Sequence, residues 1–228
     1  MKTCKVWIPV GKDEKVSGII KIPDTFESSK AVGVILAHGA ANDMNNPLIV
    51  AAARGLCEEG FLTLRFNFLY KEKERKSPDS QKKLVNTWQC VYQYLKDHPE
   101  FTVENVVAAG KSMGGRVASQ MAAAGELPVQ GLVFLGYPLH APGKKDKLKD
   151  SHLYDINVPL LFFAGTRDSL CDLGLLKKVL ARLKVARELE VVDGGDHSFK
   201  MLKSADISAE QVHDQIIRKM AAWLKAKL

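Results

Sequence analysis

The sequence Gly110-Lys111-Ser112-Met113-Gly114 lies between two segments of different character. Residues 105–109 before it form an apolar, β-branched run, and the small residues 115–124 after it favour a helix. We therefore predict a strand, a sharp turn and a helix, with Ser112 at the apex. Glycines flank the serine because such a turn brings backbone segments very close together. The structural alternative is an ordinary strand-to-helix loop in which Ser112 is the helix N-cap.

The sequence on either side alternates between strand and helix signals from about Ala31 to the end. The expected strands are residues 31–37, 61–68, 105–109, 130–135, 159–164 and 188–192. The expected helices begin at Pro47, at Ser77-Pro78, near Gly115, at Leu173 and at a capping box of Ser208 and Gln211. This alternation predicts a mostly parallel, doubly wound sheet with helices on both faces.

Two shorter strands precede this pattern. Residues 6–10 and 16–22 are joined by the turn 11–14, which predicts an antiparallel hairpin. Pro9 places the hairpin at the edge of the sheet, because proline cannot donate a ladder hydrogen bond. With no internal repeat and no linker, we expect a single domain of residues 1–228.

Open parallel sheets place their chemistry at the carboxyl ends of the strands. The residues expected there are His38-Gly39-Ala40, Ser112, Asp168 and His197. The order Ser112, Asp168, His197 is the nucleophile–acid–histidine order of the α/β-hydrolases. Three separate strand ends therefore agree on a catalytic triad.

The chemical roles follow from these residue types. His197 would accept the hydroxyl proton of Ser112 during attack on a carbonyl carbon, while Asp168 would orient the imidazole. The backbone N–H groups of Met113 and Ala40 are the expected oxyanion-hole donors. No cofactor and no metal are expected for this chemistry, and the expected partner is a small-molecule substrate.

Other acidic residues compete for the acid role. Asp168 would also suit a structural role, either as a cap of the next helix or as a partner of Arg167. Asp193 and Asp196 are further candidates, but both lie on the same turn as His197 and are too near it.

Several other side chains near the strand ends have two interpretations. His38 is expected to be structural rather than a general base. His140 and Leu139 follow a strand end and are candidates for lining the pocket, and a plain loop role is the alternative. Cys171 is interpreted as a packing residue, as isolated thiols usually are.

Composition narrows the remaining classes. The net charge is +7, and the lysines cluster at residues 71–76 and 144–149, where acidic residues also occur. Neither cluster has interleaved aromatic residues or a DNA-binding module, so we expect solvated loops and no nucleic-acid partner. No apolar run is long enough to span a bilayer, and the N-terminus lacks a signal-peptide core. The four cysteines, which form no C-x-x-C pair, favour a reduced, cytoplasmic protein. Composition does not fix the oligomeric state.

These motifs resemble those of the dienelactone-hydrolase-like branch of the α/β-hydrolase superfamily. More narrowly, the chain resembles the small family that includes a testis-expressed hydrolase-like protein and a subunit of a histone-acetyltransferase complex. The resemblance implies an eight-stranded α/β-hydrolase sheet and the same triad, and it implies no substrate. It rests on the segments Leu36–Ala40, Gly110–Arg116, Tyr137–His140, Gly165–Asp168 and Asp196–Ser198.

Two departures from the resembled proteins refine the expectation. Many α/β-hydrolases insert a helical cap between the sixth and seventh strands, where this chain has only residues 136–158. We therefore expect no substantial cap and an open site for small esters, thioesters or amides. Dienelactone enzymes use a cysteine nucleophile, so Ser112 argues against that particular reaction. The alternative function is a non-catalytic protein-interaction module on a hydrolase scaffold.

Overall fold

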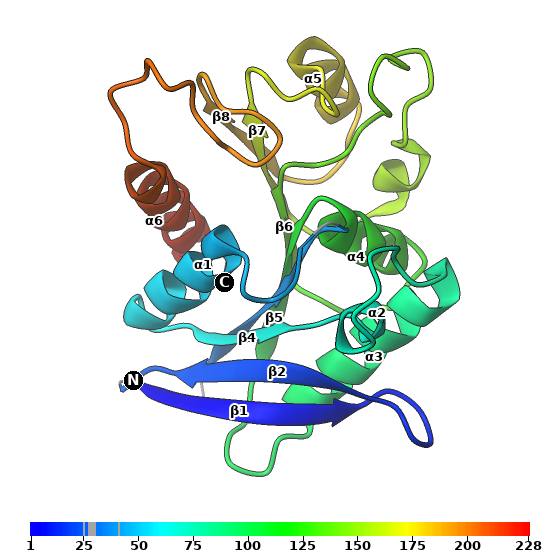
Figure 1. Cartoon of the computed structure of the whole chain (residues 1–228), viewed down its shortest axis with the longest axis vertical. Helices are drawn as coiled ribbons and strands as arrows, with labels where there is room; N and C mark the ends of the chain where they lie inside the picture. Colours follow the sequence, from blue (N-terminus) through cyan, green and yellow to red (C-terminus); the bar gives the residue numbers. More distant parts are fainter. Residues whose placement is uncertain (25, 27–30, 41) are drawn as a thin grey trace.

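The structure is a computed structural model that describes residues 1–24, 26, 31–40 and 42–228. Its strands form one eight-stranded sheet in the order β1-β2-β4-β3-β5-β6-β7-β8 (Figure 1). The strands are β1 Lys2–Pro9, β2 Lys15–Ile22, β3 Val32–Ala37, β4 Leu62–Phe66, β5 Asn105–Lys111, β6 Gly131–Leu135, β7 Leu160–Gly165 and β8 Arg187–Val192. The helices are α1 Pro47–Glu58, α2 Leu69–Glu72, α3 Gln81–Lys96, α4 Met113–Ala123, α5 Leu173–Ala181 and α6 Ala209–Lys227, with a 3₁₀ helix, η2, at Ser151–Asp155.

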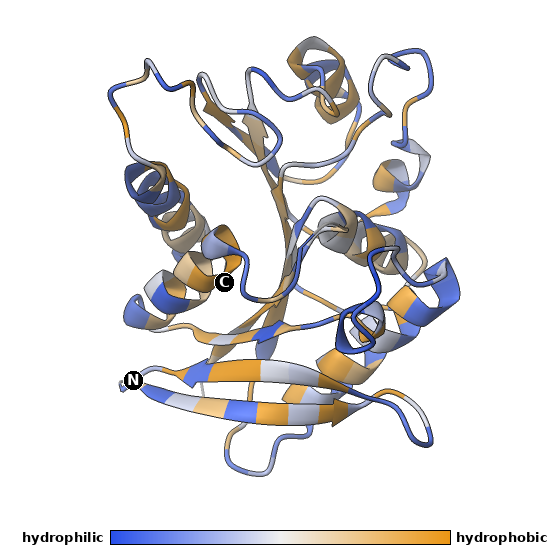
Figure 2. Ribbon diagram, in the orientation of Figure 1, coloured by the Kyte–Doolittle hydropathy of each residue, from blue (hydrophilic) through white to orange (hydrophobic). Residues whose placement is uncertain are grey.

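The strand directions match the expected topology. β1 pairs antiparallel with β2, and β2 pairs antiparallel with β4. Every other pairing in the sheet is parallel. The predicted hairpin is therefore confirmed at the edge, and β1 shows the alternating exposed and buried residues of a strand with one solvated face (Figure 2).

Helices cover both faces of the sheet, as Figure 1 shows. Successive side chains of a strand point to opposite faces, so one strand contributes to two cores. In β3, Val34 and Leu36 pack in the core under α1 and α6, whereas Ile35 packs in the core under α3, α4 and α5. All three are fully buried, which explains the continuous apolar run in the sequence.

The helix α3 begins later than the sequence predicts. Its N-cap is Ser80, not a residue of the Ser77-Pro78 pair. The reason is Asp79, which is buried, accepts the N–H of Tyr70 at 2.8 Å and pairs with Arg75. These bonds hold the chain before residue 80 against the short helix α2, an element that the sequence did not predict.

The connection between β6 and β7 contains no cap. Residues 136–158 are all described, and their only helical segment is the five-residue η2. The predicted mostly parallel, eight-stranded sheet is confirmed. Among the described residues, no helix has the length and apolar character needed to cross a membrane.

Candidate active site

The turn between β5 and α4 carries Ser112 in a strained conformation, with φ 49° and ψ −114°. A Cβ atom at Gly110 would lie 2.2 Å from the nitrogen of Gly115, and one at Gly114 would lie 2.7 Å from the carbonyl oxygen of His38. Only glycine is tolerated at such distances. Ser112 occupies the N-cap position of α4, but its side chain makes no capping hydrogen bond. The tight turn is therefore confirmed, and the simple N-cap alternative is wrong.

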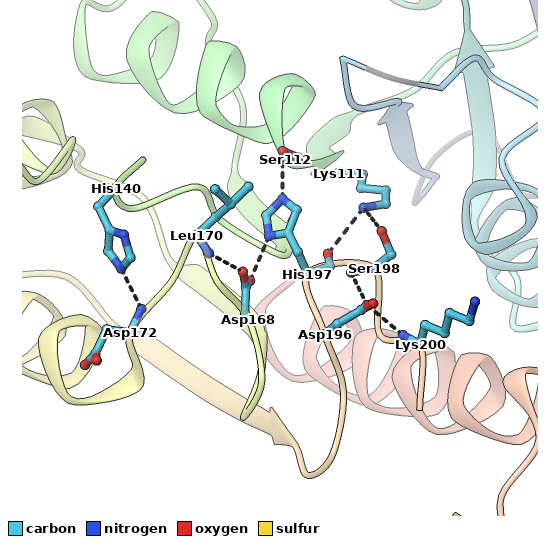
Figure 3. Close-up of polar contacts among 10 residues, drawn as sticks. All are labelled: Lys111, Ser112, His140, Asp168, Leu170, Asp172, Asp196, His197, Ser198 and Lys200. Carbon is cyan, nitrogen blue, oxygen red and sulfur yellow. Dashed lines mark hydrogen bonds and ion pairs between the residues drawn. The ribbon is translucent and has the colours of Figure 1, made fainter. Parts of the chain in front are cut away.

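His197 joins Ser112 to Asp168 (Figure 3). Its Nε2 lies 2.9 Å from Ser112 Oγ, and its Nδ1 lies 2.7 Å from Asp168 Oδ2. An ionised carboxylate can only accept, so Nδ1 carries the proton and Nε2 accepts from the serine hydroxyl. The side chain of Asp168 is fully buried and that of His197 is 18% exposed. The structure thus brings together the three residues that the sequence placed at separate strand ends.

The structural alternatives for Asp168 are occupied by other groups. Asp172, not Asp168, caps α5. Arg167 donates to the carbonyl oxygen of Gly194 at 3.0 Å. The second oxygen of Asp168 accepts the N–H of Leu170 at 2.8 Å, which fixes the carboxylate facing His197.

The competing acids Asp193 and Asp196 shape the loop after β8 instead. Asp193 accepts from the hydroxyl of Thr166 at 3.2 Å. Asp196 Oδ1 accepts the N–H groups of Ser198 at 2.8 Å and Lys200 at 2.9 Å. These bonds stabilise the turn that presents His197, and they leave Asp168 as the carboxylate bonded to the imidazole.

His140 and Leu139 do not reach solvent, contrary to their predicted pocket-lining role. Leu139 is 0% exposed and His140 is 1% exposed. His140 Nε2 accepts the N–H of Asp172 at 3.0 Å, Nδ1 donates to Ala141, and the His140 N–H donates to the carbonyl oxygen of Leu170. His140 therefore ties the loop after β6 to the loop that carries Asp168 (Figure 3).

His38 is structural, as the sequence indicated. Nδ1 donates to the carbonyl oxygen of Gly39 at 2.8 Å, and Nε2 accepts the N–H of Phe68 at 3.1 Å. Burial lowers the pKa of His38 to about 4, so the ring is neutral near pH 7. The hydroxyl of Tyr70 donates to the carbonyl oxygen of Ala40 at 2.8 Å. Together these contacts hold the loop after β3.

That loop lies beside the nucleophile. A Cβ atom at Gly39 would lie 3.4 Å from Ser112 Cβ. Ala40 follows directly and is partly buried, whereas Ala41 lies outside the described residues. Met113 begins α4, where main-chain N–H groups have no intrahelical acceptor. Both predicted oxyanion donors are therefore located near Ser112, and their role stays a prediction.

Lys111 is a polar residue of the site that sequence reasoning missed. It is 3% exposed, and its Nζ donates to the carbonyl oxygen of His197 at 3.3 Å and to Ser198 Oγ at 3.2 Å. Burial lowers the pKa of Lys111, and the charges of Asp168 and Asp196 oppose this fall. The lysine links the strand before the nucleophile to the loop that carries the imidazole (Figure 3). In the sequence, only its position next to Ser112 could have indicated that Lys111 belongs to the site.

A second serine–histidine pair joins Ser119 of α4 to His152 of η2. Ser119 Oγ and His152 Nε2 are 2.8 Å apart. Ser119 is 0% exposed and donates to the carbonyl oxygen of Arg116, and Tyr137 beside it donates to the carbonyl oxygen of Lys149. Both hydroxyls thus have a carbonyl acceptor for their proton, an arrangement that fits His152 Nε2 as the donor to the two oxygens. No sequence motif indicates this partly buried pair.

The cysteines are free thiols, and Cys57 and Cys171 are buried. Burial raises the pKa of Cys171 to about 12, so it is a protonated packing residue near pH 7, as expected. Within the described part of the chain, no group of three or more His, Cys, Asp or Glu side chains is arranged to hold a metal ion.

Comparison with known proteins places this geometry in context. Residues 30–225 match the model of the family described as an alpha/beta hydrolase domain. A dienelactone hydrolase from Anabaena variabilis has a TM-score of 0.78 at 22% identity, covering 100% of this chain and 98% of that one. Est1E from Butyrivibrio proteoclasticus, with ferulic acid bound, has a TM-score of 0.77 at 16% identity, covering 97% and 98%. An esterase from Pyrococcus furiosus has a TM-score of 0.76 at 18% identity, covering 99% and 91%. At these identities the likeness establishes the fold.

Proposed function

The chain belongs to the α/β-hydrolase domain family, and on this premise we propose that it is a serine hydrolase that cleaves a small carboxylic ester, thioester or amide. The observation that carries the proposal is the position of His197, bonded to Ser112 on one side and to Asp168 on the other. A neutral serine hydroxyl is a poor nucleophile, and a correctly oriented imidazole overcomes this.

In the proposed reaction, Ser112 Oγ attacks the carbonyl carbon of the substrate while His197 Nε2 takes the hydroxyl proton. Asp168 accepts from Nδ1 and stabilises the imidazolium that forms. The imidazolium then gives its proton to the leaving alcohol, thiol or amine. The acyl group stays on Ser112 until a water molecule, deprotonated by His197, attacks the ester and releases the acid.

The negative charge that develops on the substrate oxygen needs donors that are already in place. The N–H groups of Met113 and Ala40 are proposed for this role, since both lie beside Ser112 and the positive end of the α4 dipole adds to their effect. One such donor is typically worth about 10² to 10³ in rate. The hydrogen bonds from His38 and Tyr70 to the loop after β3 would hold the N–H donor of Ala40 in place.

The missing cap bears on substrate size. Residues 136–158, which connect β6 and β7, contain only the short helix η2 and form no cap that could enclose a long acyl chain. We therefore favour small, accessible esters over long lipids. The structural neighbours named as a dienelactone hydrolase and an esterase are compatible with this choice.

The proposal is tested by labelling with a fluorophosphonate probe, which reacts with activated serines. Wild-type protein should take up the probe on the peptide that contains Ser112, as mass spectrometry would detect. Ser112→Ala should abolish labelling. Ser119→Ala is the matched control, because it removes a serine bonded to a histidine on the same helix, and it should label as the wild type does.

The rival function is a non-catalytic interaction module, motivated by the resemblance to a family that includes a complex subunit. Folded wild-type protein that takes up no probe and cleaves no aryl ester would contradict the hydrolase proposal and favour the module. The closed hydrogen-bond chain from Ser112 to Asp168 supports the hydrolase.

A further inference from the structure

A cavity of about 450 Å³ lies beside the triad, between the start of α1, the loop after β8 and the start of α6. We call it the lysine cavity, because Lys111, Lys200 and Lys203 contribute to its wall. His213 and Asn46 are its other nitrogen-bearing side chains. Neither Ser112 nor His197 lines it, so it is distinct from the space directly over the nucleophile.

The charge of this cavity is one-sided. None of the described residues that line it is acidic. Among the ion pairs of the described residues, none involves Lys111, Lys200 or Lys203. Other lysines of the chain do pair, such as Lys145 with Asp172 and Lys219 with Glu190. Three cations therefore line one cavity without a direct ion pair, and the carboxylates of Asp168 and Asp196 act on Lys111 only through space.

Lys111 is the most informative of the three, because it is buried. Its Nζ contacts only neutral oxygens, the carbonyl of His197 and the hydroxyl of Ser198. A buried charge that lacks an opposite charge is incompletely compensated. An anion in the lysine cavity would supply the missing partner.

Two further features add to this preference. Pro47 and Ala209 lie at the first turns of α1 and α6, whose dipoles place positive potential at the cavity. The rest of the wall is apolar, with Leu48, Met201 and Ile207. A ligand with an anionic group and a short hydrocarbon part matches such a wall better than a bare ion does.

The cavity adjoins the reacting groups through two chain neighbours. Lys111 immediately precedes Ser112, and Ser198 immediately follows His197. An acyl or alcohol portion that extends from Ser112 past His197 would run toward the wall of the cavity at Lys111 and Ser198.

We propose that the lysine cavity binds an anionic group, a carboxylate or a phosphate, that the substrate carries on its acyl or alcohol portion. This inference rests on the proposed hydrolase function and narrows its substrate class to anionic esters. It also assigns Lys200 and Lys203 as specificity determinants.

The test compares two esters that differ only in charge, 4-nitrophenyl butyrate and 4-nitrophenyl hemisuccinate. The wild-type ratio of kcat/KM, hemisuccinate over butyrate, is expected to exceed one. In Lys200→Glu/Lys203→Glu this ratio should fall by about tenfold or more, the size of a lost charge-assisted contact. The matched control is Lys144→Glu/Lys147→Glu, which makes the same change of net charge on an exposed loop away from the cavity. The control ratio should stay within about twofold of wild type, since distant exposed charges are screened.

An equal fall in the control variant, or an unchanged ratio in the cavity variant, would overturn the anion site while leaving hydrolysis intact. Hydrolysis of neither ester would instead count against the hydrolase function. In that case binding decides the anion site, by titration of succinate and of inorganic phosphate followed through backbone amide NMR shifts of residues 198–203. Saturable shifts that the cavity variant loses would support the site, and their absence would overturn it. The two titrants also distinguish carboxylate from phosphate.

Discussion

Two serines, one at the N-cap of helix α4 and one within it, each contact a histidine, and the two contacts have nearly the same length. Ser112 Oγ lies 2.9 Å from His197 Nε2, and Ser119 Oγ lies 2.8 Å from His152 Nε2. Distance alone would rank Ser119 first. The surroundings of the two pairs reverse that order.

The first difference is the direction of the proton. Asp168 fixes the proton of His197 on Nδ1, so Nε2 is free to accept from Ser112. At the second pair, Ser119 has the carbonyl oxygen of Arg116 as an acceptor for its proton, and no hydrogen bond from a carboxylate of the described residues fixes the tautomer of His152. The second difference is access, because Ser119 is 0% exposed and Ser112 is partly exposed at the strained turn. A serine–histidine contact therefore indicates catalysis only with the correct tautomer and an accessible hydroxyl.

Replacing the histidine of each pair should give the greatest difference in kcat between the two pairs. His197→Gln should lower kcat for an aryl ester by about 10⁶, the loss typical of removing a triad base. His152→Gln should leave kcat within about threefold, because it changes a buried structural bond away from the nucleophile. Stopped-flow release of nitrophenol would measure both. A similar loss in the two variants would mean that the tautomer argument is wrong.

The acid gives the next effect. Asp168→Asn should lower kcat by about 10⁴, since an amide favours the wrong imidazole tautomer. Asp193→Asn is the matched control, as it removes the nearby competing carboxylate, and it should stay within about threefold of wild type. If Asp193→Asn lowers kcat more than Asp168→Asn does, then Asp193, and not Asp168, is the acid of the triad.

The contrast between the two pairs also shows what a sequence reveals. Ser112, Asp168 and His197 each follow a strand, and strand ends can be read from apolar runs and turn residues, so their convergence was predictable. The Ser119–His152 pair depends on how η2 packs against α4, and no local pattern encodes that packing.

Errors in the sequence reading have the same origin. The start of α3 was misplaced because Asp79 makes a tertiary bond to Tyr70. His140 was a candidate for lining the pocket because it follows a strand end, with a plain loop role as the alternative, and its ring bonds the neighbouring backbone at Asp172. Lys111 was given no role of its own, since the order of residues along the chain does not reveal its contact with His197.

A third histidine, His38, makes the stability of the fold depend on pH. The pKa of His38 falls from 6.5 to about 4 on burial, so above pH 6.5 it is neutral in both the folded and the unfolded state. Between pH 6.5 and 4 the unfolded chain binds a proton that the folded chain does not, so stability falls as pH falls. At about 1.4 kcal/mol for each pKa unit, His38 would contribute a loss of about 3 kcal/mol by pH 4.

Urea denaturation at several pH values between 7 and 4 measures this loss. His152 and His98 have pKa values that burial also lowers, so they add to the slope with the same sign. His38→Gln keeps an acceptor for the N–H of Phe68 and should flatten the profile. A profile that is equally steep in His38→Gln would show that the loss comes from the other groups.

The last and smallest effect is on stability. Here Ser119 should matter more than Ser112, whereas for activity Ser112 should matter more. Ser119→Ala should lower the free energy of unfolding by about 1 kcal/mol, because it removes a buried acceptor for His152 and the bond to Arg116. Ser112→Ala should change it by less than about 0.5 kcal/mol, because this hydroxyl is partly exposed and the strained backbone is present in either variant. Chemical denaturation at pH 7 resolves the difference. If Ser112→Ala is the more destabilising change, then Ser112 serves to stabilise the fold. Its contact with His197 would then no longer support a catalytic role.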